Sequence, residues 1–404
     1  MTEFKICAVS DLHLSTNPRL WKEANSLALA GYKIVIITVW TSSKTREKDL
    51  KFINHPNIEY KAGINLIPGE VNPWKRLYYR LRRRLTYELK KYLGIESLWS
   101  ITYSPRTMLN IVLNENADLY IAHSETGILI GSLLIKKGKK VAFDIEDWYS
   151  NDYLVSSRPI KLLKHYEEFS LVKGIYSTCP SQAMANALQE IYSLKKKSVV
   201  IYNGFSVNEN KTVDIESFNL MPSLVWFSQT IGHGRGLESI ITALEKLDIP
   251  VQLNLIGDCV SEYDKELTAI FPFSLGHQLQ IHRAVPHTEL ITLLPKFDIG
   301  LAVENNYPPN KNKTISNKIL QYLQAGLKVL ATNTDGQIEV ANHFPDTIKL
   351  IDANNQILWA ERLKLLISSP AVNRFAIFAK FNEVFSWEAQ EIKLLKLVYK
   401  ALHE

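Results

Sequence analysis

Residues 226–244, WFSQTIGHGRGLESIITAL, decide the prediction of the fold. The stretch opens with apolar residues suited to a buried strand, continues into a loop that contains Gly232, Gly234 and Gly236, and closes with apolar residues at helical spacing. A strand, a glycine-containing loop and a helix in this order begin a βαβ unit. The stretch therefore predicts a parallel sheet with helices on its faces.

Short β-rich runs alternate with helical patterns on both sides of this stretch, as expected for parallel sheets with crossover helices. Because 404 residues exceed one ordinary core, we predict two Rossmann-like α/β domains, 1–205 and 206–384, with the polar residues 206–223 as the linker region. Ligands are expected at the carboxyl ends of the strands. The expected strands are 4–10, 33–39, 118–123, 140–144, 174–179 and 198–203, then 223–228, 251–257, 279–285, 298–303, 328–332 and 347–352.

Composition argues against several classes of protein. The three cysteines are far apart and odd in number, which fits a reducing compartment and offers neither a disulfide framework nor a metal cluster. Asp11 interrupts the N-terminal sequence before a signal-peptide core can form, and apolar runs such as 34–40 are too short to span a bilayer. We therefore expect a cytoplasmic protein.

The first expected strand does not continue into a dinucleotide-binding turn. Residues 4–10 run directly into DLHLSTNPR, where a dehydrogenase of this architecture would have G-x-G-x-x-G. The absence of that fingerprint from the sequence removes the main support for a dehydrogenase.

Charge is divided unevenly between the two halves. Residues 1–205 carry 29 Lys and Arg against 19 Asp and Glu, which leaves +10, and the remainder carries 18 against 22, which leaves −4. Two different roles are therefore expected, with the basic half facing an anionic surface or substrate.

The stretch NPWKRLYYRLRRRLTYELKKYL (72–93) has apolar residues at helical spacing among eight basic ones. One interpretation is a helix that packs its apolar face on the sheet and turns its basic face to water. The other is a peripheral patch, residues 74–91, that meets anionic lipids or a lipid-diphosphate acceptor. Nucleic acid is not expected as a partner, because the sequence has no nucleic-acid-binding module.

Several segments resemble the GT-B glycosyltransferases and, within them, the large retaining family 4. The stronger matches are 226–244, LNLIGD (253–258), AVPHTELITLLPKFDIGLAV (284–303) and SNKILQYLQAGLKVLATNTDGQIEV (316–340), and the weaker ones are 17–38, 122–127, 180–188 and 202–205. The resemblance implies an acceptor domain over 1–205, a donor domain over 206–384 that faces it across a cleft, and a C-terminal helix, 385–404, that packs back on the first domain.

The activity that the resemblance implies is transfer of a sugar, of hexosyl type, from a nucleotide diphosphate sugar to an acceptor hydroxyl. Retention of configuration without a required metal or other cofactor is implied as well. The expected setting is synthesis of a surface polysaccharide or lipid-linked glycan, at the inner face of the membrane. A nucleotide-sugar epimerase and a non-catalytic relative that binds a nucleotide or glycan remain alternatives.

The resemblance places the donor pyrophosphate at Gly234, Arg235 and Gly236. The glycines allow the backbone to approach the phosphates, Arg235 can pair with them, and the next helix points its positive end at the same place. Arg235 stands where the family has a lysine, and Gln229 where it usually has an arginine. The further donor-binding residues that the resemblance assigns are Lys318, Gln321, Thr334, Asp335 and Gly336.

Two positions depart from the family pattern. The family often has glutamates eight positions apart, for the donor sugar and the ribose, and here Lys313 and Gln321 stand in their places. Gln321 can still hydrogen-bond a ribose diol, whereas Lys313 cannot accept hydrogen bonds from sugar hydroxyls. Glu304 is too far away in the sequence to replace that glutamate unless its loop follows a different path.

On the acceptor side, His123 ends an expected strand and is predicted as the catalytic residue, in contact with the donor sugar; a purely structural histidine is the alternative. The segment DIEDW (144–148) is expected to line the acceptor side, where Glu146 or Asp147 orients a hydroxyl. Its D-x-D appearance is not taken as a metal site, because the phosphate signals lie in the other half of the chain.

Overall fold

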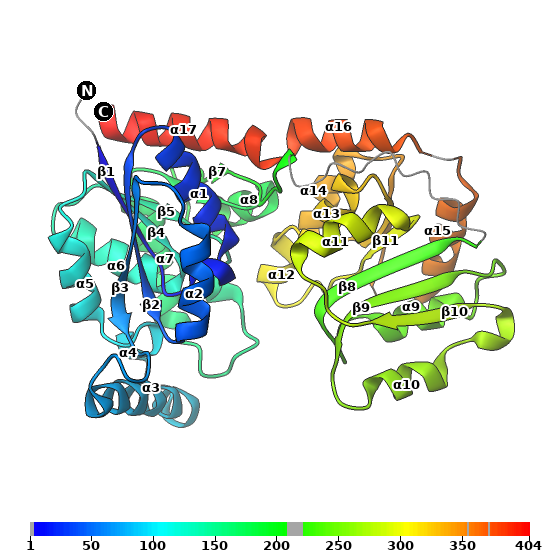
Figure 1. Ribbon diagram of the computed structural model, residues 1–404, viewed down its shortest axis with the longest axis horizontal. Helices are drawn as coiled ribbons and strands as arrows, with labels where there is room; N and C mark the ends of the chain where they lie inside the picture. Colours follow the sequence, from blue (N-terminus) through cyan, green and yellow to red (C-terminus); the bar gives the residue numbers. More distant parts are fainter. Residues whose placement is uncertain (1–3, 208–220, 354, 371) are drawn as a thin grey trace. The chain divides into compact units, whose positions relative to one another are not determined.

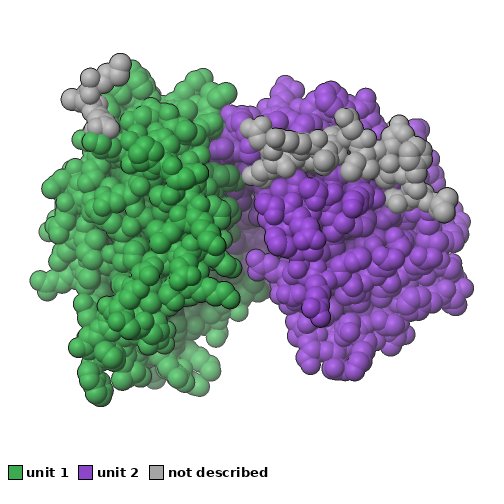
Figure 2. Space-filling model, viewed as in Figure 1, with its two compact units in different colours: residues 1–201, 391–404 green, residues 202–390 purple. Residues whose placement is uncertain are grey.

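The computed structural model describes residues 4–207, 221–353, 355–370 and 372–404. The chain forms two compact units (Figure 2): unit 1 comprises Met1–Ile201 with Glu391–Glu404, and unit 2 comprises Tyr202–Gln390. Most of the expected linker, 206–223, lies outside the described residues.

Unit 1 contains a seven-stranded parallel sheet in the order β3-β2-β1-β4-β5-β6-β7. Its central strands are continuous apolar runs buried on both faces, as parallel sheets covered by helices require. The strands are β1 (Lys5–Val9), β2 (Lys33–Trp40), β3 (Ile58–Asn65), β4 (Leu119–His123), β5 (Val141–Asp144), β6 (Ser177–Cys179) and β7 (Val199–Val200).

The edge strand β3 was not predicted from the sequence. Its residues IEYKAGIN mix charged and apolar side chains, and only Ile58, Gly63 and Ile64 are buried. The side chains of this edge strand are less buried than those of the central strands, so fewer of them need to be apolar. Its hydrophobic pattern in the sequence is therefore weaker.

Helices flank this sheet (Figure 1), and α3 follows the carboxyl end of β3. The helices of unit 1 up to β7 are α1 (Pro18–Leu29), α2 (Ser43–Phe52), α3 (Pro73–Leu93), α4 (Leu98–Ile101), α5 (Pro105–Asn114), α6 (Ser124–Ile135), α7 (Ile160–Lys173) and α8 (Gln182–Ile191).

Unit 2 contains a six-stranded parallel sheet in the order β10-β9-β8-β11-β12-β13, and all six strands match expected ones. The strands are β8 (Ser223–Ile231), β9 (Gln252–Cys259), β10 (Gln278–His282), β11 (Ile299–Ala302), β12 (Lys328–Thr332) and β13 (Ile348–Ile351). The helices are α9 (Leu237–Leu244), α10 (Tyr263–Ile270), α11 (His287–Leu293), α12 (Pro309–Lys313), α13 (Asn317–Gln324), α14 (Asp335–His343), α15 (Gln356–Ser368) and α16 (Arg374–Val384). The two sheets confirm the predicted pair of Rossmann-like α/β domains.

The last helix, α17 (Trp387–His403), begins in unit 2, and its residues from Glu391 onward belong to unit 1. There Lys140 Nζ donates a hydrogen bond to the Ala401 carbonyl oxygen at 3.2 Å, and the Phe4 and His403 rings meet edge to face at 5.1 Å. Leu394 and Val398 are buried. The C-terminal segment is therefore part of the core of unit 1, beside the starts of β1 and β5.

Candidate functional site

The loop between β8 and α9 needs its glycines. Gly234 and Gly236 have φ angles of +72° and +78°, in the left-handed region that side chains with a Cβ rarely adopt. At Gly236 an added Cβ would also lie 2.5 Å from Cγ1 of Val303. Arg235 between them is exposed, and the N-terminus of α9 follows directly. The arrangement leaves a cation and a positive helix end open to an anion.

The segment after β11 connects this loop to the start of α13. Asn305 Nδ2 donates to the Gly234 carbonyl oxygen at 3.2 Å, and the neighbouring Glu304 accepts hydrogen bonds from Lys318 Nζ at 2.7 Å and Ser316 Oγ at 2.9 Å. The sheet order reverses between β8 and β11, so these groups lie at the switch point where ligands of such sheets bind. Glu304, set aside at the sequence level, therefore supplies a carboxylate to this edge.

The other position with an unexpected side chain, Lys313, is paired as well. Its Nζ forms an ion pair with Asp335 Oδ2, which also accepts from Asn312 Nδ2 at 3.1 Å. Thr334 caps α14 by accepting from Gln337 N at 3.4 Å, and an added Cβ at Gly336 would lie 2.3 Å from the Thr314 carbonyl oxygen. Lys313 and the predicted donor residues 334–336 thus form one cluster at the start of α14.

Gln321 is buried in α13 and is already hydrogen-bonded. Its Nε2 lies 3.1 Å from Nδ1 of His287 on α11. A contact between this amide and the ribose stays a prediction. In such a contact Gln321 would bind both the ribose and His287.

A hollow of about 440 Å³ lies at the carboxyl ends of β9 and β10, beside the glycine loop. Sites for small ligands commonly have this size. None of its lining residues was among the predicted donor contacts: they are Gly257, Asp258, Cys259, Asp264, Thr268, Ile281, His282 and Arg283.

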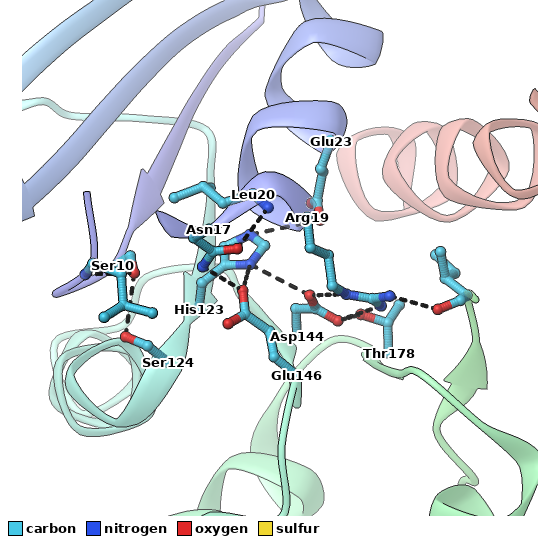
Figure 3. Close-up of polar contacts among 12 residues, drawn as sticks. Ser10, Asn17, Arg19, Leu20, Glu23, His123, Ser124, Asp144, Glu146 and Thr178 are labelled. Atoms are coloured by element: carbon cyan, nitrogen blue, oxygen red, sulfur yellow. Dashed lines mark hydrogen bonds and ion pairs between the residues drawn. The ribbon is translucent and has the colours of Figure 1, made fainter. Parts of the chain in front are cut away.

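In unit 1, His123 lies at the centre of a buried polar cluster (Figure 3). Its Nδ1 is 3.0 Å from Glu146 Oε1 and 3.4 Å from Asp144 Oδ2, and its Nε2 is 3.6 Å from Glu23 Oε2. Arg19 holds Asp144 by two hydrogen bonds, of 2.5 Å from Nε and 2.7 Å from Nη2. Cations and carboxylates of α1, β4, β5 and the segment just after β5 thus offset one another in the interior.

The surroundings of His123 favour its charged form. Burial alone would lower the pKa of the imidazole, but the Glu23 carboxylate and the hydrogen bonds to Asp144 and Glu146 raise that pKa to about 10. Burial raises the pKa of Glu23, while the Arg19 guanidinium and His123 outweigh burial and lower the pKa of Asp144. At neutral pH the ring is an imidazolium, which can donate hydrogen bonds or stabilise negative charge but cannot act as a base.

The two predicted acceptor-side residues differ in their surroundings. Glu146 accepts from Asn17 Nδ2 at 2.7 Å besides pairing with His123, so it belongs to the buried cluster (Figure 3). Asp147, the next residue in the chain, is half-buried. Contact of either residue with an acceptor stays a prediction.

A second set of polar groups, not predicted from the sequence as a site, lies beyond the carboxyl ends of the neighbouring strands β1 and β4. The strand order of unit 1 reverses between these two strands, so this is its switch point. Ser124, with a φ of +65° at the start of α6, donates to Asp11 Oδ1. Glu125 forms an ion pair of 3.0 Å with Arg158 Nε, and burial raises its pKa to about 7. Burial raises the pKa of Asp11 as well. One signal for this site is present in the sequence: Glu125 stands two residues after His123, the last residue of β4.

Two parallel Rossmann-like sheets of seven and six strands, with a long C-terminal helix, define the GT-B fold, as predicted. The chain is similar to a glycosyltransferase from Rickettsia africae ESF-5, with 16% identity, a TM-score of 0.68 and coverage of 100% of both chains. It is similar to sucrose-phosphate synthase from Thermosynechococcus elongatus, with 13% identity, a TM-score of 0.70 and coverage of 98% of this chain and 99% of that one. It is also similar to Anabaena HepE in complex with UDP-glucose, with 14% identity, a TM-score of 0.66 and coverage of 98% and 100%.

The sequence itself matches no protein-family model and no curated protein. At these identities the structural similarities establish the fold, while activity has to be argued from the side chains.

Proposed function

We propose that the protein is a glycosyltransferase that moves a sugar from a nucleotide diphosphate sugar to an acceptor hydroxyl, with retention of configuration. The observation that carries the proposal is the switch-point edge of unit 2. There an exposed arginine, a glycine loop, the N-termini of two helices and the Lys318–Glu304 pair converge at the ends of β8 and β11. Such an edge suits a ligand with two phosphates and a sugar.

The leaving group of this reaction is a nucleotide diphosphate, which develops negative charge as the glycosidic bond breaks. Fixed cations and helix N-termini stabilise that charge without having to reorganise during the reaction. Arg235 is the proposed partner of the pyrophosphate, and Lys318 supplies a second positive charge at the start of α13. A uridine diphosphate sugar is the first donor to test, because HepE forms complexes with UDP and with UDP-glucose.

The proposed contact for the donor sugar is Glu304. Lys313, where the family has a glutamate, cannot accept hydrogen bonds and is engaged with Asp335. The carboxylate of Glu304 lies at the same edge, held between Ser316 and Lys318. Once Lys318 turns to a phosphate, that carboxylate is available to accept from sugar hydroxyls.

The acceptor is assigned to unit 1, at the ends of β1 and β4. The acidic groups there, Asp11 and Glu125, can accept hydrogen bonds from an acceptor hydroxyl, and the buried imidazolium of His123 offsets the negative charge of the carboxylates around it. A glycan or a lipid-linked saccharide is the proposed acceptor class, handled in the cytoplasm.

The decisive experiment combines binding with turnover. Thermal shift and calorimetry with UDP, GDP and their sugars identify the donor, because a ligand bound by the folded state raises the midpoint. Incubation with that donor then separates the alternatives. Slow release of sugar and nucleotide with the anomeric centre retained supports the proposal. A changed sugar still attached to its nucleotide indicates an epimerase, and tight binding with no turnover, with and without glycan acceptors, indicates a non-catalytic relative.

A further inference from the structure

Helix α3 turns its apolar side to solvent. Asn72 caps its start by accepting from the backbone N–H of Trp74 at 2.9 Å, and Gly94, with φ of +68°, ends it. Trp74 is 78% exposed, Leu81 57%, Leu85 58% and Tyr92 70%, and Leu77 and Tyr78 are exposed as well. These side chains recur every three or four residues and share one face. We call this face the α3 stripe.

The opposite face of α3 attaches the helix to unit 1, and it does so largely through arginines. Tyr79 and Thr86 are the buried residues of the helix. Arg82 Nη2 donates to the Tyr103 carbonyl oxygen at 2.6 Å, and the Arg83 guanidinium lies 4.3 Å from the centre of the Tyr103 ring. The expectation of an apolar face packed on the sheet is therefore wrong: the fold uses cations to hold α3 and leaves the stripe uncovered.

The surroundings of the stripe are positively charged. Lys75, Arg80, Arg84 and Lys91 are exposed, and none of them forms an ion pair with any residue that the structure describes. Glu88 is the sole acidic residue of α3, against eight Lys and Arg. An apolar strip bordered by unpaired cations matches the chemistry of an anionic bilayer surface.

We propose that α3 binds an anionic lipid bilayer, with the α3 stripe in the interface between headgroups and acyl chains and Arg80, Arg84 and Lys91 at the headgroups. Trp74, Tyr78 and Tyr92 have amphipathic rings of the kind that occupy this depth. None of the described helices is long and apolar enough to cross a membrane, so the attachment is peripheral. A second copy of the chain fits less well, because two facing α3 helices would bring their unpaired cations together around the seam.

The same helix lies next to the proposed acceptor edge. The charge of Arg83, on the inner face of α3, acts on Asp11, and both Asp11 and α3 follow carboxyl ends of strands in the unit 1 sheet. A bilayer bound by the α3 stripe would therefore lie at the end of unit 1 where the acceptor is proposed to bind. The inference goes beyond the proposed function and does not depend on it, because lipid binding is measured without turnover.

The test is co-sedimentation of the full chain with vesicles of pure phosphatidylcholine and of phosphatidylcholine with 30% phosphatidylglycerol, at about 0.05 and 0.5 M salt. One variant removes three stripe residues, by Trp74→Ser, Leu81→Ser and Leu85→Ser. A second removes three bordering cations, by Arg80→Ser, Arg84→Ser and Lys91→Ser. A matched control removes three exposed cations from another helix of unit 1, by Lys44→Ser, Lys48→Ser and Lys51→Ser.

Wild type is expected to prefer the anionic vesicles and to lose most of that preference at high salt. Both α3 variants should partition at least tenfold more weakly than wild type. Each basic residue near the surface contributes about a fivefold factor, and each apolar side chain of the stripe contributes its burial in the interface. The α2 control should stay within about twofold of the wild type. All the changed residues are exposed, so circular dichroism should show unaltered folding. Equal partitioning of the stripe variant and wild type would overturn the proposal. So would a wild-type dimer that the stripe variant abolishes, without lipid binding.

Discussion

Lys318 and Glu304 form an ion pair at the N-terminus of α13, with Nζ and Oε1 2.7 Å apart. Both side chains are mostly shielded from solvent, and Ser316 Oγ donates to the same carboxylate oxygen. The pair joins a cation suited to phosphate and a carboxylate suited to sugar hydroxyls within one contact. A donor that used both side chains would have to break the ion pair between Lys318 and Glu304.

This relationship predicts opposite effects for two ligands. In Glu304→Gln, Lys318 loses its carboxylate partner and is freer to bind phosphate, so affinity for the nucleotide diphosphate should stay the same or rise. Affinity for the nucleotide sugar should fall at least tenfold relative to that diphosphate, because a charge-assisted hydrogen bond to the sugar contributes about 1.5–3 kcal/mol. Calorimetry with UDP and UDP-glucose measures both. Equal losses for the two ligands would show that Glu304 only supports the local fold.

Arg235 should bind the pyrophosphate. Replacing it with Ala is expected to weaken nucleotide-diphosphate binding by about 1.5–3 kcal/mol, the usual range for a charge-assisted contact. Lys246→Ala provides the control, since Lys246 is an exposed cation just beyond the other end of α9. If calorimetry gave the same affinity for both variants and for wild type, the pyrophosphate would have to bind elsewhere.

The His123 cluster should make the stability of unit 1 depend on pH. Because the folded-state pKa of His123, about 10, exceeds its ordinary value of 6.5, its contribution is fully present below pH 6.5 and is lost as pH rises towards 10. Each unit of pKa difference corresponds to about 1.4 kcal/mol, so the loss should amount to a few kcal/mol at most. Hydrogen exchange of the β4 and β5 amides at pH 7 and 9 measures this loss of stability, once the exchange rates are corrected for intrinsic base catalysis.

The matched variant for this pH effect is His123→Asn, which lacks the titrating group. Its protection in β4 and β5 should be lower at pH 7 and should change less between pH 7 and 9. A variant with the same pH dependence as wild type would assign the effect to other groups, such as Glu23 or Glu125.

Deletion of residues 391–404 should destabilise unit 1 more than unit 2. The deletion removes the buried side chains of Leu394 and Val398 and the contact of Lys140 with Ala401. Each large apolar side chain lost from a core costs about 2–5 kcal/mol. Hydrogen exchange should show loss of protection in β1 and β5 first. Uniform loss across both units, or loss confined to unit 2, would contradict this assignment.

The fold was largely predictable because the buried strands are continuous apolar runs separated by helical patterns. The site was only partly predictable. Sequence position suggested that Glu304 was remote from α13, whereas the path of the loop after β11 brings its carboxylate to Lys318. A loop path depends on contacts such as the hydrogen bond from Asn305 to Gly234, which leave no periodic signal. For α3, spacing showed which residues share a face, but it could not show which face the arginine contacts would turn inward.

The division of α17 between the two units has a consequence for synthesis of the chain. Unit 2 is complete once residue 390 has been made, but at that point unit 1 still lacks residues 391–404. At 5–20 residues per second, translation from residue 201 to residue 391 takes roughly 10–40 s. During that interval the surface later covered by Leu394 and Val398 is exposed on the nascent first unit, where it can be bound by chaperones. The domain made first is therefore the last to reach its native state.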